Sequence, residues 1–219
     1  MEKLLTFSNI YNIIFPFAYF YLCHVVIRHY DKESRDKLEY TRKDRIILFI
    51  ELLAIILVLI ERKDIPFIET HLLIFIFGYL MFQSYTDYKM REVYCIFNYL
   101  AIAIGLSFSL IYMLNCSFDM IVLMPKFIGM AGIIVFLLIA KFAKLYGGGD
   151  GEVILACALL LFSTDHLIST NGLFIGVIIG LFISLIYKVI VIVIKKADKT
   201  VAMVPAIAIG IYLATFIGV

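Results

Sequence analysis

The chain has 219 residues and a formal net charge of +2; 63% of its residues are hydrophobic and 16% are charged. Its mean hydropathy is +1.03. A soluble domain averages about half apolar and about a quarter charged residues, so this composition excludes an ordinary soluble globular domain. We expect one integral membrane domain over residues 1–219, in contact with membrane lipid, with no separate soluble domain and no nucleic-acid partner.

Hydrophobic stretches along the chain predict an all-α, polytopic membrane helix bundle. A helix needs roughly 20 mostly apolar residues to cross about 30 Å of hydrocarbon. Candidate segments occur at 6–28, 46–60, 66–86, 93–113, 120–144, 153–168, 172–194 and 201–218. The second and the sixth are shorter than the others. We therefore predict eight transmembrane helices.

The basic residues are distributed unequally among the connections, and this orients the predicted bundle. If the N-terminus lies outside, 15 of the 19 lysines and arginines lie on the inner side. The charged segment 29–45 then forms a short cytoplasmic connector. It is either exposed to water and in contact with anionic lipid, or it is a docking surface for a partner or a leader peptide. We predict a multi-pass protein of the plasma membrane with both termini outside.

Two aspartates stand in short polar breaks at the predicted inner face. Asp87 lies in TDYKMRE (86–92), at the end of the third helix, and Asp150 lies in GGGDGEV (147–153), in the loop before the sixth. Two predicted helices separate them, so the chain leaves this face and returns to it. The topology permits the two carboxyl groups to meet at one membrane–water boundary.

A pair of neighbouring carboxyls suits hydrolysis of a peptide bond. One carboxylate activates water and the other carboxyl protonates the scissile group, because two adjacent carboxyls cannot both ionise. Glycine before Asp150 allows close backbone approach and a positive φ where one is needed. The pattern predicts carboxylate catalysis without a metal or another cofactor.

The motif Gly147-Gly148-Gly149-Asp150 resembles the Gly-x-Gly-Asp signature of intramembrane aspartic proteases, and the layout of the chain is most similar to the type IV prepilin peptidases. The segment Asp87–Val93 resembles that family's first aspartate motif, and Met203–Gly210 resembles its Pro-containing last helix. The resemblance implies an endopeptidase that removes the short basic leader of prepilins or pseudopilins at the cytoplasmic membrane face. Asp87 and Asp150 would be catalytic, and Gly147 and Gly149 would shape the loop carrying Asp150.

The chain departs from the family in three places. Glu152 stands where the family usually has lysine, and Val93-Tyr94 replaces the usual Ile-Pro. The connector 29–45 has no cysteine, whereas bifunctional members carry a cysteine-tetrad zinc domain there. The N-methyltransferase activity of those members is therefore unsupported. The four cysteines (Cys23, Cys95, Cys116 and Cys157) match no metal site, and we expect them to be buried.

Three alternatives stay open. Pro205-Ala206-Ile207 is similar to the Pro-Ala-Leu of presenilin-like and signal-peptide-peptidase-like proteases, which use the same pair of aspartates. An ion-coupled transporter would use Asp87, Asp150 and Glu51 as coupling sites near the membrane midplane. A non-catalytic scaffold would use the glycines as a hinge. Ionisable residues inside predicted spans are further functional candidates: His24, Glu51, Glu69 and His71.

Overall fold

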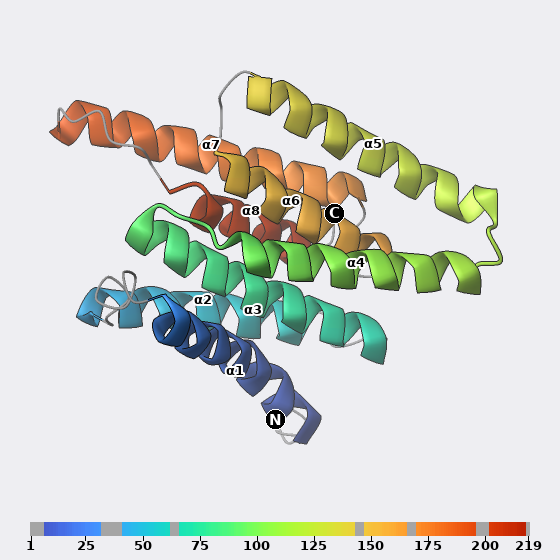
Figure 1. The fold of residues 1–219 in the computed structure, drawn as a ribbon, viewed down its shortest axis with the longest axis horizontal. Helices are drawn as coiled ribbons and strands as arrows, with labels where there is room; N and C mark the ends of the chain where they lie inside the picture. Colours follow the sequence, from blue (N-terminus) through green and yellow to red (C-terminus); the bar gives the residue numbers. More distant parts are fainter. Residues whose placement is uncertain are drawn as a thin grey trace.

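The computed structural model describes residues 7–31, 41–61, 66–142, 147–165, 170–195 and 202–217. In these ranges all regular structure is helical (Figure 1). The helices are α1 (Phe7–Tyr30), α2 (Arg42–Glu61), α3 (Phe67–Met90), α4 (Cys95–Asn115), α5 (Met120–Phe142), α6 (Gly148–Phe162), α7 (Thr170–Lys195) and α8 (Val204–Ile217). Within these ranges, the prediction of an all-α fold with eight helices is confirmed.

Two of the described helices, α4 and α5, are long and apolar enough to cross a membrane. Shorter apolar helical segments cover Ile175–Tyr187 and Val204–Phe216. Large apolar side chains stand exposed along the outer faces of α4, α5 and α7, including Leu110, Ile121 and Phe182. Exposed apolar surface of this extent marks contact with a membrane or a partner.

The centre of the bundle is α3, whose apolar residues occur on every side of the helix. Phe77, Tyr79, Leu80, Met81 and Phe82 follow one another almost without a break, and each is 0% exposed. Such a helix must be surrounded by other helices. Accordingly α1, α6 and α8 all pack against α3. The shorter helix α6 is buried almost as completely, from Val153 to Phe162.

Glycines bring α7 and α8 into close contact. A Cβ atom added at Gly180 of α7 would lie 2.7 Å from the carbonyl oxygen of Ala206 in α8, and one added at Gly176 would lie 3.0 Å from that of Gly210. Paired small residues four apart allow helix backbones to approach in this way. The start of α8 is therefore fixed laterally by α7.

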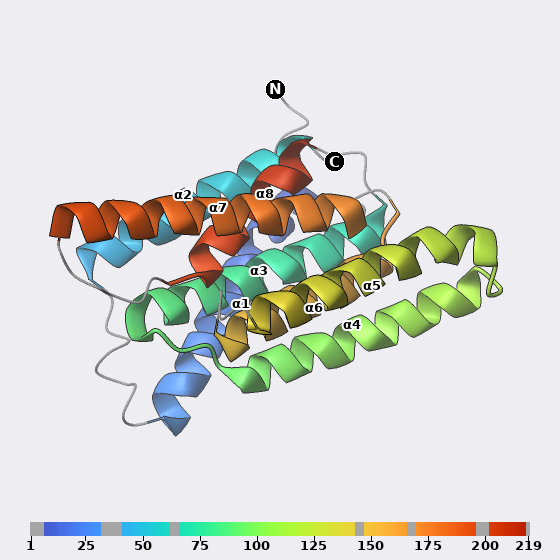
Figure 2. The same ribbon diagram turned by 90° about the horizontal axis from the view of Figure 1, so that it is seen from above.

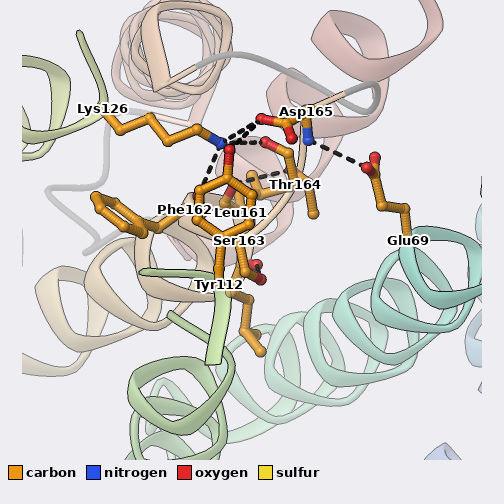
Figure 3. Close-up of polar contacts among 9 residues, drawn as sticks. Glu69, Tyr112, Lys126, Leu161, Phe162, Ser163, Thr164 and Asp165 are labelled. Carbon is orange, nitrogen blue, oxygen red and sulfur yellow. Dashed lines mark hydrogen bonds and ion pairs between the residues drawn. The ribbon is translucent and has the colours of Figure 1, made fainter. Parts of the chain in front are cut away.

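Polar residues gather at the two ends of the bundle. At one end, called here the Asp87 end, the C-terminus of α3 lies beside the N-termini of α6 and α8, as both ribbon views show (Figures 1 and 2). At the other, called here the Lys126 end, Lys126 of α5 reaches the end of α6 (Figure 3). Its ammonium donates to the carbonyl oxygens of Phe162 at 3.0 Å and Thr164 at 2.6 Å.

The Lys126 ammonium is also paired with a carboxylate and an aromatic ring. It lies 2.8 Å from Asp165 Oδ1 and 4.2 Å from the ring centroid of Tyr112, whose hydroxyl donates to the same Asp165 oxygen at 2.7 Å. Cations stabilise helix C-termini because the last carbonyl groups have no partner within the helix. This cluster ties α4, α5 and the end of α6 together.

The predicted boundaries of two helices need correction. The sixth helix begins at Gly148 and not at residue 153, and it ends at Phe162 and not at 168. The third continues to Met90, beyond the expected residue 86. A polar side chain sets each end of α6: the Asp150 carboxylate accepts a hydrogen bond from Gly147 N–H at its start, and the Lys126 ammonium donates to the carbonyl oxygen of Phe162 at its end. Residues 166–168 lie outside the described part of the chain.

Candidate active site

Asp87 occupies the last turn of α3, the position expected from the sequence. The helix ends at Arg91, which adopts a left-handed backbone with φ 61° and donates its N–H to the carbonyl oxygen of Asp87. A non-glycine residue in this region is uncommon and ends a helix sharply. Asp87 is only 6% exposed, so its carboxyl needs partners inside the protein.

The partner of the Asp87 carboxyl is the N-terminus of α8. The backbone N–H of Val204, the first residue of α8, donates to Asp87 Oδ2 at 2.9 Å. The first N–H groups of a helix have no partner within it and carry partial positive charge, which makes this end a natural anion site. The segment Met203–Gly210 is therefore more than a last helix, because its first turn holds a candidate catalytic group.

Asp150 is the third residue of α6. Its Oδ2 atom accepts a hydrogen bond from Gly147 N–H at 2.8 Å, which is one half of a capping box. A carboxylate in the first turn also interacts favourably with the helix dipole. Asp150 is 8% exposed, so both candidate carboxyls are buried.

The expectation that Asp150 lies in a glycine loop is wrong. Gly148, Gly149 and Asp150 form the first turn of α6, and Gly147 is its N-cap residue, with φ −75° and ψ 163°. Gly147 and Gly149 do not adopt positive φ. The predicted loop is absent here because the Asp150 carboxyl caps the helix and starts it early.

Close approach is instead the reason for glycine at position 149. A Cβ atom built on Gly149 would lie 2.8 Å from Val93 Cβ, which is closer than such atoms pack. Val93 belongs to the non-helical segment between α3 and α4. The missing side chain at Gly149 thus lets the start of α6 lie against the segment that follows Asp87.

Burial raises the pKa of both carboxyls, and the charge of Asp87 also acts on Asp150. Burial raises the pKa of Asp150 to about 6, the Gly147 N–H opposes this rise, and the charge of Asp87 adds to it. Burial also raises the pKa of Asp87, against the lowering effects of the Val204 N–H, the Arg91 guanidinium and the Met203 N–H. The close approach of Gly149 to Val93 places the two aspartates at the same end of the bundle, where the charge of one acts on the other.

Sequence reasoning missed a buried polar cluster beside Asp87 and Asp150. Tyr79 and Gln83 precede Asp87 at intervals of four residues, and both side chains donate to Asn98 Oδ1 at 2.6 Å. Asn98 in turn donates to Glu152 Oε2 at 2.9 Å. The sequence does contain a sign of this cluster: Tyr79, Gln83 and Asp87 are spaced by four residues, so they lie on one face of a helix.

The end of the connector 29–45 packs against α3. Asp44 is 2% exposed and forms an ion pair with Lys89, two residues after Asp87. The side chain and N–H of Thr41 also donate to Asp44. The prediction of a solvated connector is therefore wrong at Asp44, while residues 32–40 lie outside the described part of the chain.

The other ionisable candidates lie away from this cluster or face other elements. Glu69 Oε1 accepts from the Asp165 N–H at 3.2 Å, at the Lys126 end (Figure 3). His71 lies two residues further along the same part of α3. His24 is buried beside Phe20 and Tyr85. Glu51 lies near Tyr212 of α8.

Among the described residues, no group of three or more His, Cys, Asp or Glu side chains could hold a metal ion. Cys23 and Cys157 are buried as expected, but Cys95 is exposed and Cys116 is partly exposed, which corrects the prediction for these two. Cys95 is exposed because it begins α4 at the edge of the bundle.

Comparisons with known protein families, with curated proteins and with solved structures find no match to this chain.

Replacing Gly149 with alanine should disturb the start of α6, because the added Cβ would overlap Val93. We expect a loss of about 1–3 kcal/mol in the free energy of unfolding, as for overpacked sites. Thermal unfolding in detergent measures this. Gly132→Ala is the matched control, since a Cβ there meets nothing within 4 Å. Val93→Gly in the Gly149→Ala background should restore part of the loss; equal melting temperatures for the two alanine variants would contradict the packing argument.

Replacing Asp150 with asparagine should stabilise the protein at neutral pH. Because the pKa of Asp150 is raised to about 6, the folded protein retains a proton that an unfolded chain releases near pH 4. Wild-type stability therefore falls as the pH rises from about 4 to about 6. Asparagine does not titrate, so the variant avoids this loss. We expect its free energy of unfolding to exceed that of wild type by up to about 3 kcal/mol at pH 7 and by little at pH 4.

Thermal unfolding at a series of pH values measures this difference. The control is Asp119→Asn, which changes an exposed aspartate in the turn between α4 and α5. Parallel curves for wild type and Asp150→Asn across the pH range would show that Asp150 has an ordinary pKa.

Proposed function

We propose that this protein is a membrane-embedded aspartic endopeptidase that removes the short basic leader of type IV prepilins or pseudopilins. One observation carries the proposal. Two buried carboxyls, from the end of α3 and the start of α6, lie close enough for the charge of Asp87 to raise the pKa of Asp150. The resemblance of the two aspartate motifs to the prepilin peptidases supplies the substrate class.

The surroundings of the two carboxyls suggest their roles. The N–H groups of Val204 and Met203 and the charge of Arg91 all favour the ionised form of Asp87, which suits it to accept a proton from water. Asp150 has one opposing N–H donor and a pKa of about 6, which suits it to carry the shared proton. Asp87 would then be the general base and Asp150 the general acid.

Hydrolysis would follow from these roles. Asp87 removes a proton from water as the water oxygen bonds to the scissile carbonyl carbon, and Asp150 gives its proton to the carbonyl oxygen. When this intermediate, a gem-diol, collapses, the carbon–nitrogen bond breaks and the leaving amine takes the proton held by Asp87. One hydroxyl of the gem-diol returns its proton to Asp150 as it becomes the carbonyl group of the product acid. The two carboxyls end with one proton between them, as they began, and no metal or cofactor is needed.

The proposed setting is the plasma membrane, crossed by all eight helices, with both termini outside and the Asp87 end in the cytoplasm. Two features support it. Polar clusters occupy the two ends of the bundle, whereas apolar side chains of α4, α5 and α7 are exposed between them. The excess of lysine and arginine in the connections at the Asp87 end favours the cytoplasm for that end. We propose peptidase activity alone, since the connector 29–45 lacks the cysteines of bifunctional relatives.

Cleavage of a prepilin-like substrate in membranes tests the proposal. The substrate carries a short basic leader joined to an apolar helix. We expect wild type to cut at the leader boundary, and Asp87→Asn and Asp150→Asn each to lose at least about 1,000-fold in rate, because each removes an essential proton carrier. Asp119→Asn, which alters an exposed aspartate remote from the site, should cleave normally at matched expression.

Other results would contradict the proposal in distinct ways. If both variants cleave as fast as wild type, Asp87 and Asp150 are not the catalytic residues. Cleavage of unrelated transmembrane helices in place of the leader boundary would favour a presenilin-like protease. A wild type inert toward prepilin-like and other helical substrates, with ion-dependent flux sensitive to Asp150→Asn, would favour a carrier.

A further inference from the structure

A buried hydrogen-bonded network joins α3, α4 and α6 beneath the aspartate pair. Its centre is Asn98 of α4, which is 0% exposed. Asn98 Oδ1 accepts from the Tyr79 hydroxyl and from Gln83 Nε2, both at 2.6 Å, and Asn98 Nδ2 donates to Glu152 Oε2 at 2.9 Å. Gln83 also donates to the carbonyl oxygen of Tyr94 at 3.3 Å. Both ends of the Asn98 amide are therefore used.

The network ends within one turn of each catalytic candidate. Gln83 lies four residues before Asp87, on the same face of α3. Glu152 lies two residues after Asp150, in the first turns of α6. Asn98 thus connects the turn that precedes Asp87 to the turn that carries Asp150. Gln83 Oε1 has no hydrogen-bond partner among the described residues, whereas both ends of the Asn98 amide are bonded, so the network holds the three helices through Asn98.

The Glu152 carboxylate is oriented toward α4. It is partly buried, accepts from Asn98 and lies beside the Cys95 thiol, and these two residues are three apart on one face of α4. Removing its partner would leave a buried polar group without a hydrogen bond, which costs about 1–3 kcal/mol. This orientation distinguishes Glu152 from Glu92, an acid at the same end of the bundle that is exposed.

We propose that Glu152 is a positioning residue: its carboxylate holds the first turn of α6 on Asn98 and so sets Asp150 against Asp87. This inference rests on the proposed peptidase function for its kinetic consequences. It assigns to Glu152 the role of hydrogen-bond acceptor toward α4, in place of charge recognition of the basic leader.

Exchanging donor and acceptor across the Asn98–Glu152 contact tests this role. Asn98→Asp keeps the oxygen that serves Tyr79 and Gln83 but puts a second carboxylate against Glu152. We expect kcat to fall about 10- to 100-fold with KM little changed, because small displacements of catalytic groups have effects of this size. Adding Glu152→Gln supplies a donor at position 152 and should restore most of the activity. Glu152→Gln alone keeps an acceptor and should stay within about threefold of wild type.

Two controls separate position from charge. Glu152→Ala removes the acceptor and should resemble Asn98→Asp, whereas Glu92→Ala removes an exposed acid and should leave kcat unchanged. The opposite result is that Glu152→Gln raises KM, and raises it more for leaders with more lysines and arginines. That result would mean that Glu152 binds the basic leader through its charge, and the positioning role would be wrong. Failure of the double variant to recover activity would also overturn the inference.

Stability provides a readout that does not depend on the proposed function. In thermal unfolding, Asn98→Asp and Glu152→Gln should be strongly non-additive, with the double variant recovering a few degrees of melting temperature. If wild type cleaves no prepilin-like substrate but this coupling is present, the proposed function fails while the network stands. Additive shifts would show that the Asn98–Glu152 contact does not exist in solution, whatever the enzyme cleaves.

Discussion

The hydrogen bond from the Val204 N–H to the Asp87 carboxyl is the contact on which the arrangement of the site depends. It joins the end of the most buried helix, α3, to the first turn of α8, which the glycines of α7 hold in place. Without such a donor, burying Asp87 would be costly, because a buried carboxylate needs hydrogen bonds or an opposite charge. With it, Asp87 can remain buried near Asp150, where its charge adds to the rise in the pKa of Asp150.

Much of the fold follows from the sequence because its causes are local. Long apolar runs predict helices, and the eight expected segments correspond to α1–α8. The placement of Asp87 and Asp150 at one end also follows, since two intervening helices, α4 and α5, return the chain to the same side. Their placement at one end needs only this topology and the helix ends, whereas their hydrogen-bond partners depend on contacts that the sequence does not reveal.

What the sequence did not predict depends on contacts between distant residues. The start of α6 depends on the Asp150 side chain, and its end depends on Lys126 from another helix. The extent of the apolar run in the sequence therefore gives the wrong position for both ends of α6. Asn98 looks like an isolated polar residue in an apolar helix until Gln83 and Glu152 are brought to it. Gly149 has an ordinary helical backbone, and only the position of Val93 explains why no side chain is present there.

The protonation of Asp150 is the most direct test of the central claim that the two aspartates act as a pair. Infrared difference spectroscopy of the carboxyl band, compared between wild type and Asp150→Asn during a pH titration in detergent, isolates this group. We expect an Asp150 pKa of about 6 in wild type, and a lower value in Asp87→Asn because the neighbouring charge is gone. A pKa near 4 that Asp87→Asn leaves unchanged would mean that the two carboxyls do not share a site, and would contradict the account.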